Sequence, residues 1–336
     1  MSISLKTHKM LWGRSGNRCA FPACRKILVE DETETDDKSI IGDEAHIVDR
    51  KSNGPRGKSD LTPKKRDKYD NLMLLCKNHH KLIDDQPNSY TVKVLHRMKQ
   101  EHLDWVNQKL NPDIKKQKDE EIYATYIDEW IKLADINNWH AWTSFIFGAG
   151  RPKISVKQYE KLKMLNEYIL SRVWPKLYPG IEFAFNNFRV ILNDFLIIFS
   201  KYKEENCSKD PWYYTEKFYE RLDRFDPKIY GKLVKKFEYH VDLVQDLMCE
   251  LTRAGNYLCD QIRKYISSSF RISEGVLLIT SGPSIHFSFD TYRLEYKSKD
   301  ENDCKYPGLR KFMEIRKERG LYFGKGISEN YFPIMF

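Results

Sequence analysis

The segment Asp43-Glu44-Ala45-His46-Ile47-Val48 decides the fold of this chain, together with Tyr69-Asp70-Asn71-Leu72 and Cys76-Lys77-Asn78-His79-His80. Each stretch joins apolar residues to side chains that bind metals or move protons. Cys19 and Cys24, earlier in the chain, supply two further thiols. Thiolate sulfur and imidazole nitrogen are the usual ligands of structural zinc, four to each ion. The pattern therefore predicts a small domain built around metal.

The cysteines and one histidine fall into two close pairs. Cys19 and Cys24 form the first pair, and Cys76 with His79 forms the second. Two close pairs separated by a long insert pin together a domain that has little core of its own. We predict that these four residues bind structural Zn²⁺. The alternative is that Cys19 and Cys24 are ordinary buried thiols, since their spacing alone is a weak signal.

Three polar residues beside the zinc pairs favour hydrolytic chemistry. His80 directly follows His79, and neighbouring side chains at a helix start diverge by about 100°. We therefore expect His80 to bind a second, catalytic cation (Mg²⁺ or Mn²⁺), unless it caps or packs the helix. His46 lies on a predicted strand, where a neutral imidazole can take a proton from water. Asn71 offers an amide that either holds the opposite loop or binds the cation.

Positive charge is concentrated between His46 and Asn71. Cations in this segment would neutralise the phosphates of DNA without reading its sequence. A solvated loop is the alternative, and the position of the run inside the motif favours DNA binding. The candidate DNA-binding residues are Lys51, Arg56, Lys58, Lys64, Lys65 and Arg66, with Lys68 following them.

As a set, these motifs resemble an HNH endonuclease of the ββα-metal fold. The resemblance covers about residues 1 to 108 and rests on Arg18-Cys19-Ala20, Glu44-Ala45-His46-Ile47, Gly54-Pro55-Arg56, Tyr69-Asp70-Asn71-Leu72 and Leu75-Cys76-Lys77-Asn78-His79-His80-Lys81-Leu82-Ile83-Asp84. It implies that His46 is the general base, Asn71 the middle motif residue and His80 a catalytic-metal ligand. Double-stranded DNA is the implied substrate.

The subgroup that the chain resembles includes HNH effector modules of bacterial anti-phage systems. Some of these are fused to a C-terminal sensor of cyclic oligonucleotides. The chain departs from the family at one position. Many HNH enzymes place an Asp or His metal ligand immediately before the base, where this chain has Ala45. Glu44 is the candidate replacement ligand, although a regular strand points its side chain to the other face.

Length and composition indicate two domains. A chain of 336 residues exceeds a typical single domain. Hydrophobic residues make up 41% of it, which is enough for folded cores, and the net charge of +9 is compatible with a nucleic-acid partner. We predict an α+β chain with a small zinc-stabilised ββα-metal domain at residues 1–110. A linker at 111–121 would join it to a mainly α-helical domain at 122–336.

Helical periods dominate the second domain. Amphipathic stretches at 155–173 and 181–202 precede the longest pattern, at 227–266. There apolar residues alternate in steps of four and three, a heptad seam broken only at Gly255. The seam predicts either the central helix of an antiparallel bundle or a self-association helix. Strands are expected near 275–297, at 275–280 and 286–289.

Other features favour a cytoplasmic protein. The seven cysteines form no regular disulfide framework. The N-terminus lacks the apolar core of a signal peptide, and no apolar run reaches the 18 residues of a membrane span. No membrane association is therefore expected. The cysteines outside the zinc pairs, expected to be buried or free thiols, are Cys207, Cys249, Cys259 and Cys304.

The second domain resembles no known family, and two tasks fit it. It binds a signal nucleotide or regulatory protein that activates the nuclease, or it holds a homo-oligomer together so that two sites cut both strands. Two further classes stay open for the whole chain. One is a non-catalytic zinc module that binds DNA or protein, which Ala45 supports. The other is a nuclease toxin subunit controlled by a partner ATPase or sensor protein.

Overall fold

The computed structural model describes residues 3–30, 39–109, 113–148, 151–206, 210–222, 224–283, 287–297 and 301–324. The chain divides into two compact units, residues 1–128 and 129–336. The division falls inside helix α5 (Ile114–Leu133), which occupies most of the segment predicted to be a linker. The lysines and glutamates of that segment are good helix formers, so a stretch poor in apolar residues still continues as helix.

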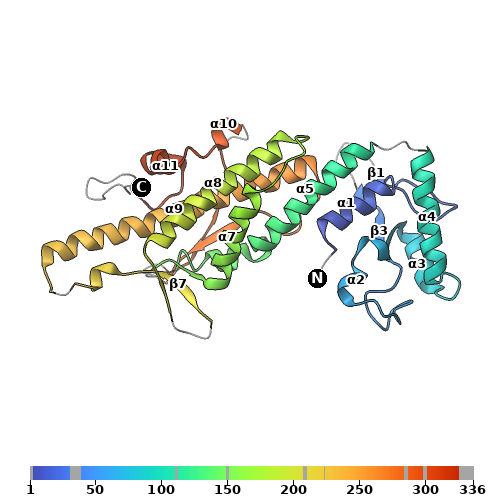
Figure 1. The fold of residues 1–336 in the computed structure, drawn as a ribbon, viewed down its shortest axis with the longest axis horizontal. Coiled ribbons are helices and arrows are strands. Elements are labelled where there is room, and N and C mark those ends of the chain that lie inside the picture. The colour runs from blue at the N-terminus through green and yellow to red at the C-terminus, as the bar shows by residue number, and fades with distance from the viewer. Residues whose placement is uncertain are drawn as a thin grey trace. The chain divides into compact units, whose positions relative to one another are not determined.

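An antiparallel strand pair followed by a helix forms the centre of the N-terminal unit (Figure 1). Strand β3 (Gly42–His46) pairs with β4 (Leu72–Cys76), so that Gly42 lies opposite Cys76 and His46 opposite Leu72. Helix α3 (Lys77–Asp85) begins directly after β4. This order, strand, strand and helix, is the ββα arrangement that the resemblance implied. It places the end of β4 and the start of α3 next to the beginning of β3.

The remaining elements of this unit surround the ββα centre. Residues 72–75 are all apolar and fully buried, and they pack with Leu11, Ile83 and Leu95 in one core cluster. A short basic helix begins at Pro63, and the Thr62 side chain before it makes no capping hydrogen bond. The surrounding elements are α1 (Leu5–Arg14), β1 (Val29–Glu30), β2 (Ser39–Ile40), α2 (Pro63–Arg66), η1 (Tyr69–Asn71) and α4 (Val92–Lys109).

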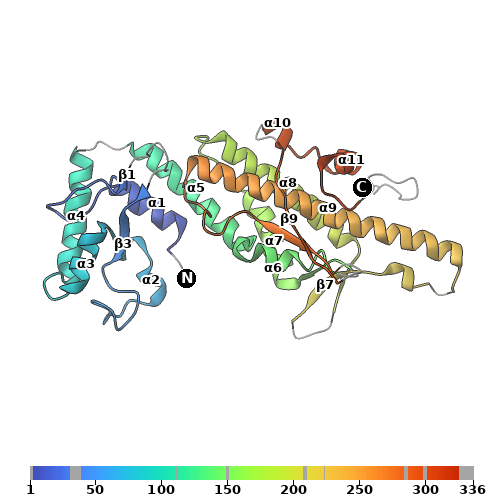
Figure 2. The ribbon, with the colours of Figure 1, turned by 180° about the vertical axis from the view of Figure 1, so that it is seen from behind.

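Two long helices form the centre of the C-terminal unit. Helices α8 (Pro179–Lys201) and α9 (Pro227–Tyr265) pack side by side, as Figures 1 and 2 both show. Helix α7 (Val156–Leu170) packs on α8. The short helices of this unit are η2 (Ile136–Asn138), α6 (Trp139–Thr143), η3 (Phe218–Glu220), α10 (Glu301–Cys304), α11 (Leu309–Ile315) and η4 (Arg316–Arg319).

Two small antiparallel sheets complete the C-terminal unit. The first has the order β5-β7-β6, formed by Lys153–Ser155, Trp212–Thr215 and Lys203–Glu205. The second pairs β8 (Leu278–Ser281) with β9 (Asp290–Arg293). The strand predicted at 286–289 is therefore wrong where it is described, because residues 287–289 precede β9; His286 lies outside the described residues. The apolar alternation there marks exposed side chains, including Phe287 and Phe289.

The predicted long helix and its seam are present in α9. The seam lies inside the unit, since every residue from 246 to 259 is buried. Packing on all sides agrees with the central-helix prediction and leaves this stretch no exposed face for self-association. Gly255 interrupts the seam because a Cβ there would lie 2.8 Å from Leu277 Cδ1.

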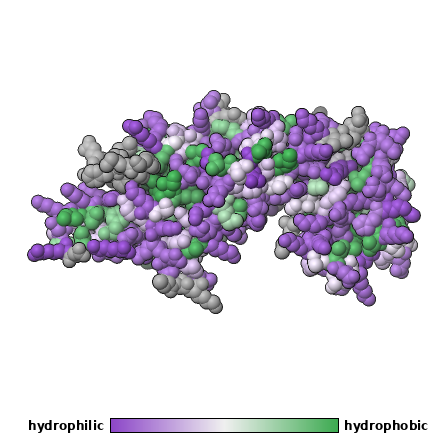
Figure 3. All heavy atoms as spheres, in the orientation of Figure 1, coloured by the Kyte–Doolittle hydropathy of each residue, from purple (hydrophilic) through white to green (hydrophobic). Residues whose placement is uncertain are grey.

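Helix α8 is long and apolar enough to cross a membrane, contrary to the expectation that no run would reach that length. Its side chains nevertheless pack inside the unit against α7 and α9, as in the core helix of a folded domain. On the face in Figure 3 the surface is mostly hydrophilic, with hydrophobic areas in several places, one of them where α9 begins. Phe225 and Ile229, there, are 70% and 49% exposed.

The predicted thiols outside the zinc pairs are buried wherever they are described. They are Cys249, Cys259 and Cys304, while Cys207 lies outside the described residues.

Candidate active site

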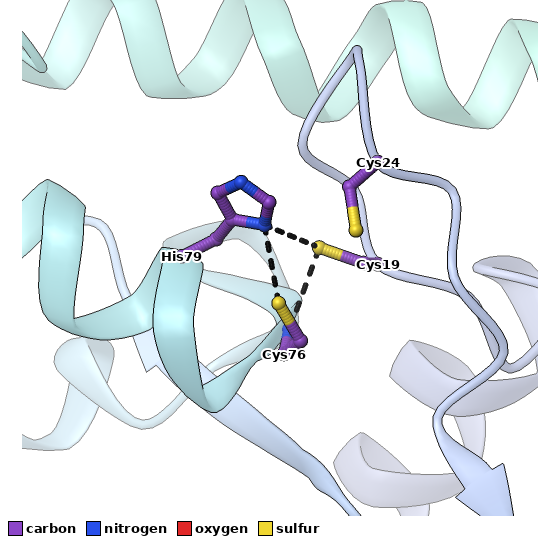
Figure 4. Close-up of side chains that lie close together, drawn as sticks. All are labelled: Cys19, Cys24, Cys76 and His79. Carbon is purple, nitrogen blue, oxygen red and sulfur yellow. Dashed lines mark hydrogen bonds between the residues drawn. The ribbon is translucent and has the colours of Figure 1, made fainter.

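Four ligand atoms converge between the loop that follows α1 and the start of α3 (Figure 4). The Sγ atoms of Cys19, Cys24 and Cys76 and one ring nitrogen of His79 all lie within 4.8 Å of one another. His79 Nδ1 is 3.1 Å from Cys76 Sγ and 3.7 Å from Cys19 Sγ. Three sulfurs and one imidazole nitrogen match the donor set of a structural zinc site. The structure thus brings together all four residues that the sequence assigned to zinc.

The surroundings of this Cys₃His cluster hold the donors in place. The Phe21 ring stacks on the His79 ring with 3.9 Å between centroids, and the Cys76 amide donates to Cys19 Sγ over 3.4 Å. Burial raises the pKa of the Cys19 thiol to about 12 and lowers the pKa of His79. A bound cation reverses the thiol's preference because it deprotonates a coordinating sulfur. The cluster therefore suits a metal ion and provides a poor site for a free thiolate.

The predicted base lies at the end of β3 and contacts a carboxylate. His46 Nε2 is 3.1 Å from Asp67 Oδ1, and the other oxygen of Asp67 is 3.5 Å from Arg50 Nη2. Asp67 follows α2, 21 residues beyond His46. An ionised carboxylate only accepts hydrogen bonds, so this contact places the imidazole proton on Nε2 and leaves the lone pair on Nδ1.

His80 lies between two carboxylates. Its Nδ1 is 3.1 Å from Asp43 Oδ2, and its Nε2 is 3.4 Å from Asp84 Oδ2. All three side chains are about one-third exposed, so the group is open to water. One imidazole nitrogen with carboxylate oxygens is a donor set that Mn²⁺ and Mg²⁺ accept. The residues fit a catalytic cation.

Glu44, the candidate replacement ligand, does not join this group. Its Oε1 accepts from Trp12 Nε1 at 3.1 Å and lies 2.6 Å from His8 Nδ1. Side chains alternate along a strand, so Asp43 and Ala45 share one face and Glu44 points to the other. The structure therefore places Asp43 beside His80. Ala45 is fully buried in the core and offers no ligand.

Asn71 has the loop-holding role that the sequence left as one of two alternatives. It is buried, its Oδ1 accepts from the Val48 amide at 2.9 Å, and its Nδ2 donates to the Val48 carbonyl at 2.8 Å. A further bond from Nδ2 reaches the Arg66 carbonyl at 2.9 Å. The side chain thus joins the end of β3 to the end of α2. It positions the segment that carries His46.

Both of the predicted DNA-binding arginines, Arg56 and Arg66, point inward. Arg56 has a side chain that is 4% exposed; it donates to the carbonyls of Ile47 and Ile83 and pairs with Asp84 at 2.6 Å. Arg66 is 6% exposed and donates to three carbonyls of its own loop. Both guanidinium groups therefore hold the loop, which corrects their assignment to DNA. The four predicted lysines, Lys51, Lys58, Lys64 and Lys65, are exposed.

Three carboxylates at this site were missed from the sequence. Asp84 had a usable signal, since it follows His80 by four residues and so shares its helix face. Asp43 depends on the strand register, which favours it over its neighbour Glu44. Asp67 had no local signal because only the folded loop brings it to His46.

Comparison with known proteins places one family in this region. Residues 19–86 match the family model described as HNH endonuclease. The match contains the Cys₃His cluster, His46, Asn71 and His80, and it ends just after α3. No curated protein sequence matches the chain. Residues 19–86 are therefore similar to an HNH endonuclease domain.

Proposed function

We propose that the HNH domain is a catalytically active, metal-dependent endonuclease that hydrolyses phosphodiester bonds of double-stranded DNA. The observation that carries the proposal is the pairing of two histidines with separate carboxylates. His46 contacts Asp67, and His80 contacts Asp43 and Asp84. A metal module that had lost its chemistry would have no need to keep both a proton acceptor held by a carboxylate and an oxygen-rich cation site. The family match supplies the reaction class.

His46 is the general base in this proposal. Its Nδ1 takes a proton from the attacking water, while Asp67 keeps the imidazole in one orientation and stabilises the imidazolium that forms. The water oxygen bonds to phosphorus as the bond to the departing sugar oxygen breaks, and solvent protonates that oxygen. His46 then returns its proton to solvent. Asn71 acts indirectly, because it fixes the backbone that follows His46.

His80, Asp43 and Asp84 would hold Mg²⁺ or Mn²⁺, and a cation there would polarise the scissile phosphate and stabilise the departing oxyanion. Arg56 fixes Asp84 from behind through its 2.6 Å ion pair. Arg56 also donates to the carbonyls of Ile47 and Ile83, so it ties the loop after β3 to the end of α3. The Cys₃His cluster would hold Zn²⁺ for the separate task of stabilising the fold.

We further propose that the nuclease is a cytoplasmic anti-phage effector whose C-terminal unit controls it, through a signal nucleotide, a regulatory protein or assembly into a homo-oligomer. The support is chemical. A cytosolic DNase that cuts without regard to sequence would attack its own host, so its activity has to be gated.

The test is plasmid degradation by the purified chain with Mg²⁺ or Mn²⁺, beside His46→Ala and an EDTA control. Each reaction is run with and without a panel of cyclic nucleotides. We expect cleavage that requires the cation and is lost in His46→Ala, while fold and zinc content are retained. Cleavage with one nucleotide only would support a ligand-gated nuclease. Cleavage without any nucleotide would support the nuclease and contradict nucleotide gating.

One observation favours a second candidate function. Ala45 is fully buried at the position where many HNH enzymes carry a metal ligand. A non-catalytic zinc module that binds DNA or protein would tolerate that residue. The same assay separates the two functions: such a module would bind without cutting under every condition, and His46→Ala would leave its binding unchanged. No cleavage together with a co-purifying ATPase or sensor would instead favour the toxin-subunit alternative.

A further inference from the structure

A hollow of about 310 Å³ adjoins the His46–Asp67 pair. We call it the α1–α2 hollow, because residues at the start of α1 and along α2 form most of its wall. Asp67 belongs both to this wall and to the contact with His46. The residues that line it are Ser4, Thr7, Arg50, Pro63, Lys64, Asp67 and Lys68.

The charge of the α1–α2 hollow is positive. Arg50, Lys64 and Lys68 face it with a single carboxylate, Asp67, so its net charge is about +2. Asp67 is already engaged by His46 at 3.1 Å and by Arg50 at 3.5 Å. Lys64 and Lys68 are exposed, and neither forms an ion pair with a residue in the described ranges. Two lysines thus remain for an external anion.

We propose that the α1–α2 hollow binds backbone phosphates of the DNA strand next to the bond that is cut; this rests on the proposed nuclease function. A polyanion whose scissile phosphate lies at His46 has to continue past the site on at least one side. The hollow gathers three cations in one cavity that begins at Asp67, and Lys64 and Lys68 are the two that pair with no carboxylate of the described residues. Lysines contact phosphates without reading bases, so the hollow positions DNA of any sequence.

The burial of Arg56 and Arg66 supports phosphate binding at the hollow. Both guanidinium groups are buried against backbone carbonyls, so the cations that can reach phosphates are others. Arg50 lies outside the basic run that the sequence favoured, yet the fold brings it together with Lys64 and Lys68 around the hollow. The surface for the strand therefore extends from the end of β3 across α2.

The test measures duplex DNA binding by fluorescence anisotropy across a salt series. The parent protein is the full chain with His46→Ala, which prevents cutting, and every other substitution is added to it. Two variants remove the hollow's charge: Lys64→Gln/Lys68→Gln, and the same pair with Arg50→Gln. A matched control removes three exposed cations from α4, through Lys93→Gln, Arg97→Gln and Lys109→Gln. None of these three lines the hollow. Thermal melting checks that every variant is folded.

We expect the slope of log K against log salt to become shallower by about 2 in the double variant and about 3 in the triple variant. Binding near 0.1 M salt should weaken about tenfold or more in the triple variant, while the α4 control keeps the parent slope. Equal losses in the hollow variants and the α4 control would overturn the assignment, because they would reflect net charge alone.

The proposed function and the hollow can fail separately. If the wild-type chain cuts DNA and the parent binds it, but the hollow variants bind like the α4 control, only the hollow is refuted. If the wild-type chain does not cut and the parent does not bind duplex DNA, the nuclease proposal fails and the hollow's role fails with it. Tighter binding of single-stranded RNA than of duplex DNA, with the same changes of slope, would overturn DNA as the ligand.

Discussion

Asp67 shows how one residue connects the proposed base, His46, to its surroundings. It is 14% exposed, with one oxygen on His46 and the other near Arg50. A carboxylate in that position selects the imidazole tautomer and supplies the negative charge that an imidazolium needs. It is therefore a positioning residue, and its effect should be visible in turnover more than in binding.

Asp67→Asn preserves size but removes the charge. We expect turnover of plasmid DNA to fall about 100-fold, within the range that general-base catalysis contributes. Affinity for DNA should stay equal or increase, because a negative charge leaves the wall of the α1–α2 hollow. Steady-state cleavage and anisotropy measure the two effects. Asp60→Asn, at an exposed residue before α2, is the control. Unchanged turnover in Asp67→Asn would show that His46 works without this partner.

At this site the sequence was sufficient for residues that carry unusual chemistry and insufficient for common ones. Cysteine and histidine at metal-ligand spacing predicted all four members of the Cys₃His cluster. Aspartate and arginine occur on every surface, so their roles depended on contacts. Arg56 was predicted to bind DNA and is instead buried against backbone. Glu44 was the candidate replacement ligand, and the structure instead places Asp43 beside His80.

Elements followed their periodicity well and their boundaries less well. The 39-residue helix α9 agrees with the pattern at 227–266 because a sustained seam admits no other structure. Composition was a weaker guide. The charged segment before residue 121 was taken for a linker, yet α5 runs through it. The strand expected at 286–289 relied on a short apolar alternation, which exposed side chains can also produce.

Within α9, His240 makes the unit sensitive to acid. It is fully buried, and neither ring nitrogen has a hydrogen-bond partner among the described residues. Burial, reinforced by Lys201 and Lys236, lowers its pKa to about 3. The ordinary pKa of about 6.5 applies when the chain is unfolded. Between these values the unfolded state binds the proton and the native state does not, so stability falls as pH drops.

We expect His240 to contribute a loss of about 1.4 kcal/mol per pH unit below pH 6. Denaturant unfolding of the wild-type chain at pH 7 and pH 5, followed by tryptophan fluorescence, measures the total loss. His240→Phe, which can keep the edge contact with the Tyr202 ring, should lose less stability over the same interval. Identical pH dependence in the two proteins would contradict the assignment to this histidine.

At the scale of the whole molecule, the two units rely on different sources of stability. The C-terminal unit has a large apolar core that includes Trp130, Trp139, Phe185 and Phe188. The N-terminal unit has the smaller core around β4, and the Cys₃His cluster joins the loop that carries Cys19 to the start of α3. Zinc binding in small domains supplies about 10 kcal/mol or more, comparable with the whole stability of a typical domain. Removing zinc should therefore affect the units unequally.

In calorimetry, we expect one thermal transition for each unit. We predict that a zinc-selective chelator abolishes the transition of the N-terminal unit or strongly lowers its temperature, and leaves the transition of the C-terminal unit in place. Cys76→Ser should reproduce this without chelator, because it removes one of four ligands. Cys304 is a buried thiol of the C-terminal unit, so Cys304→Ala should instead lower the transition temperature of that unit and keep the zinc content. A single transition that moves as a whole would mean that the units unfold together. Two transitions unmoved by chelation would show that the cluster does not hold the N-terminal fold. The predicted pattern would leave the C-terminal unit folded without an intact N-terminal unit, so its ligands and its oligomeric state could be studied in the metal-depleted chain.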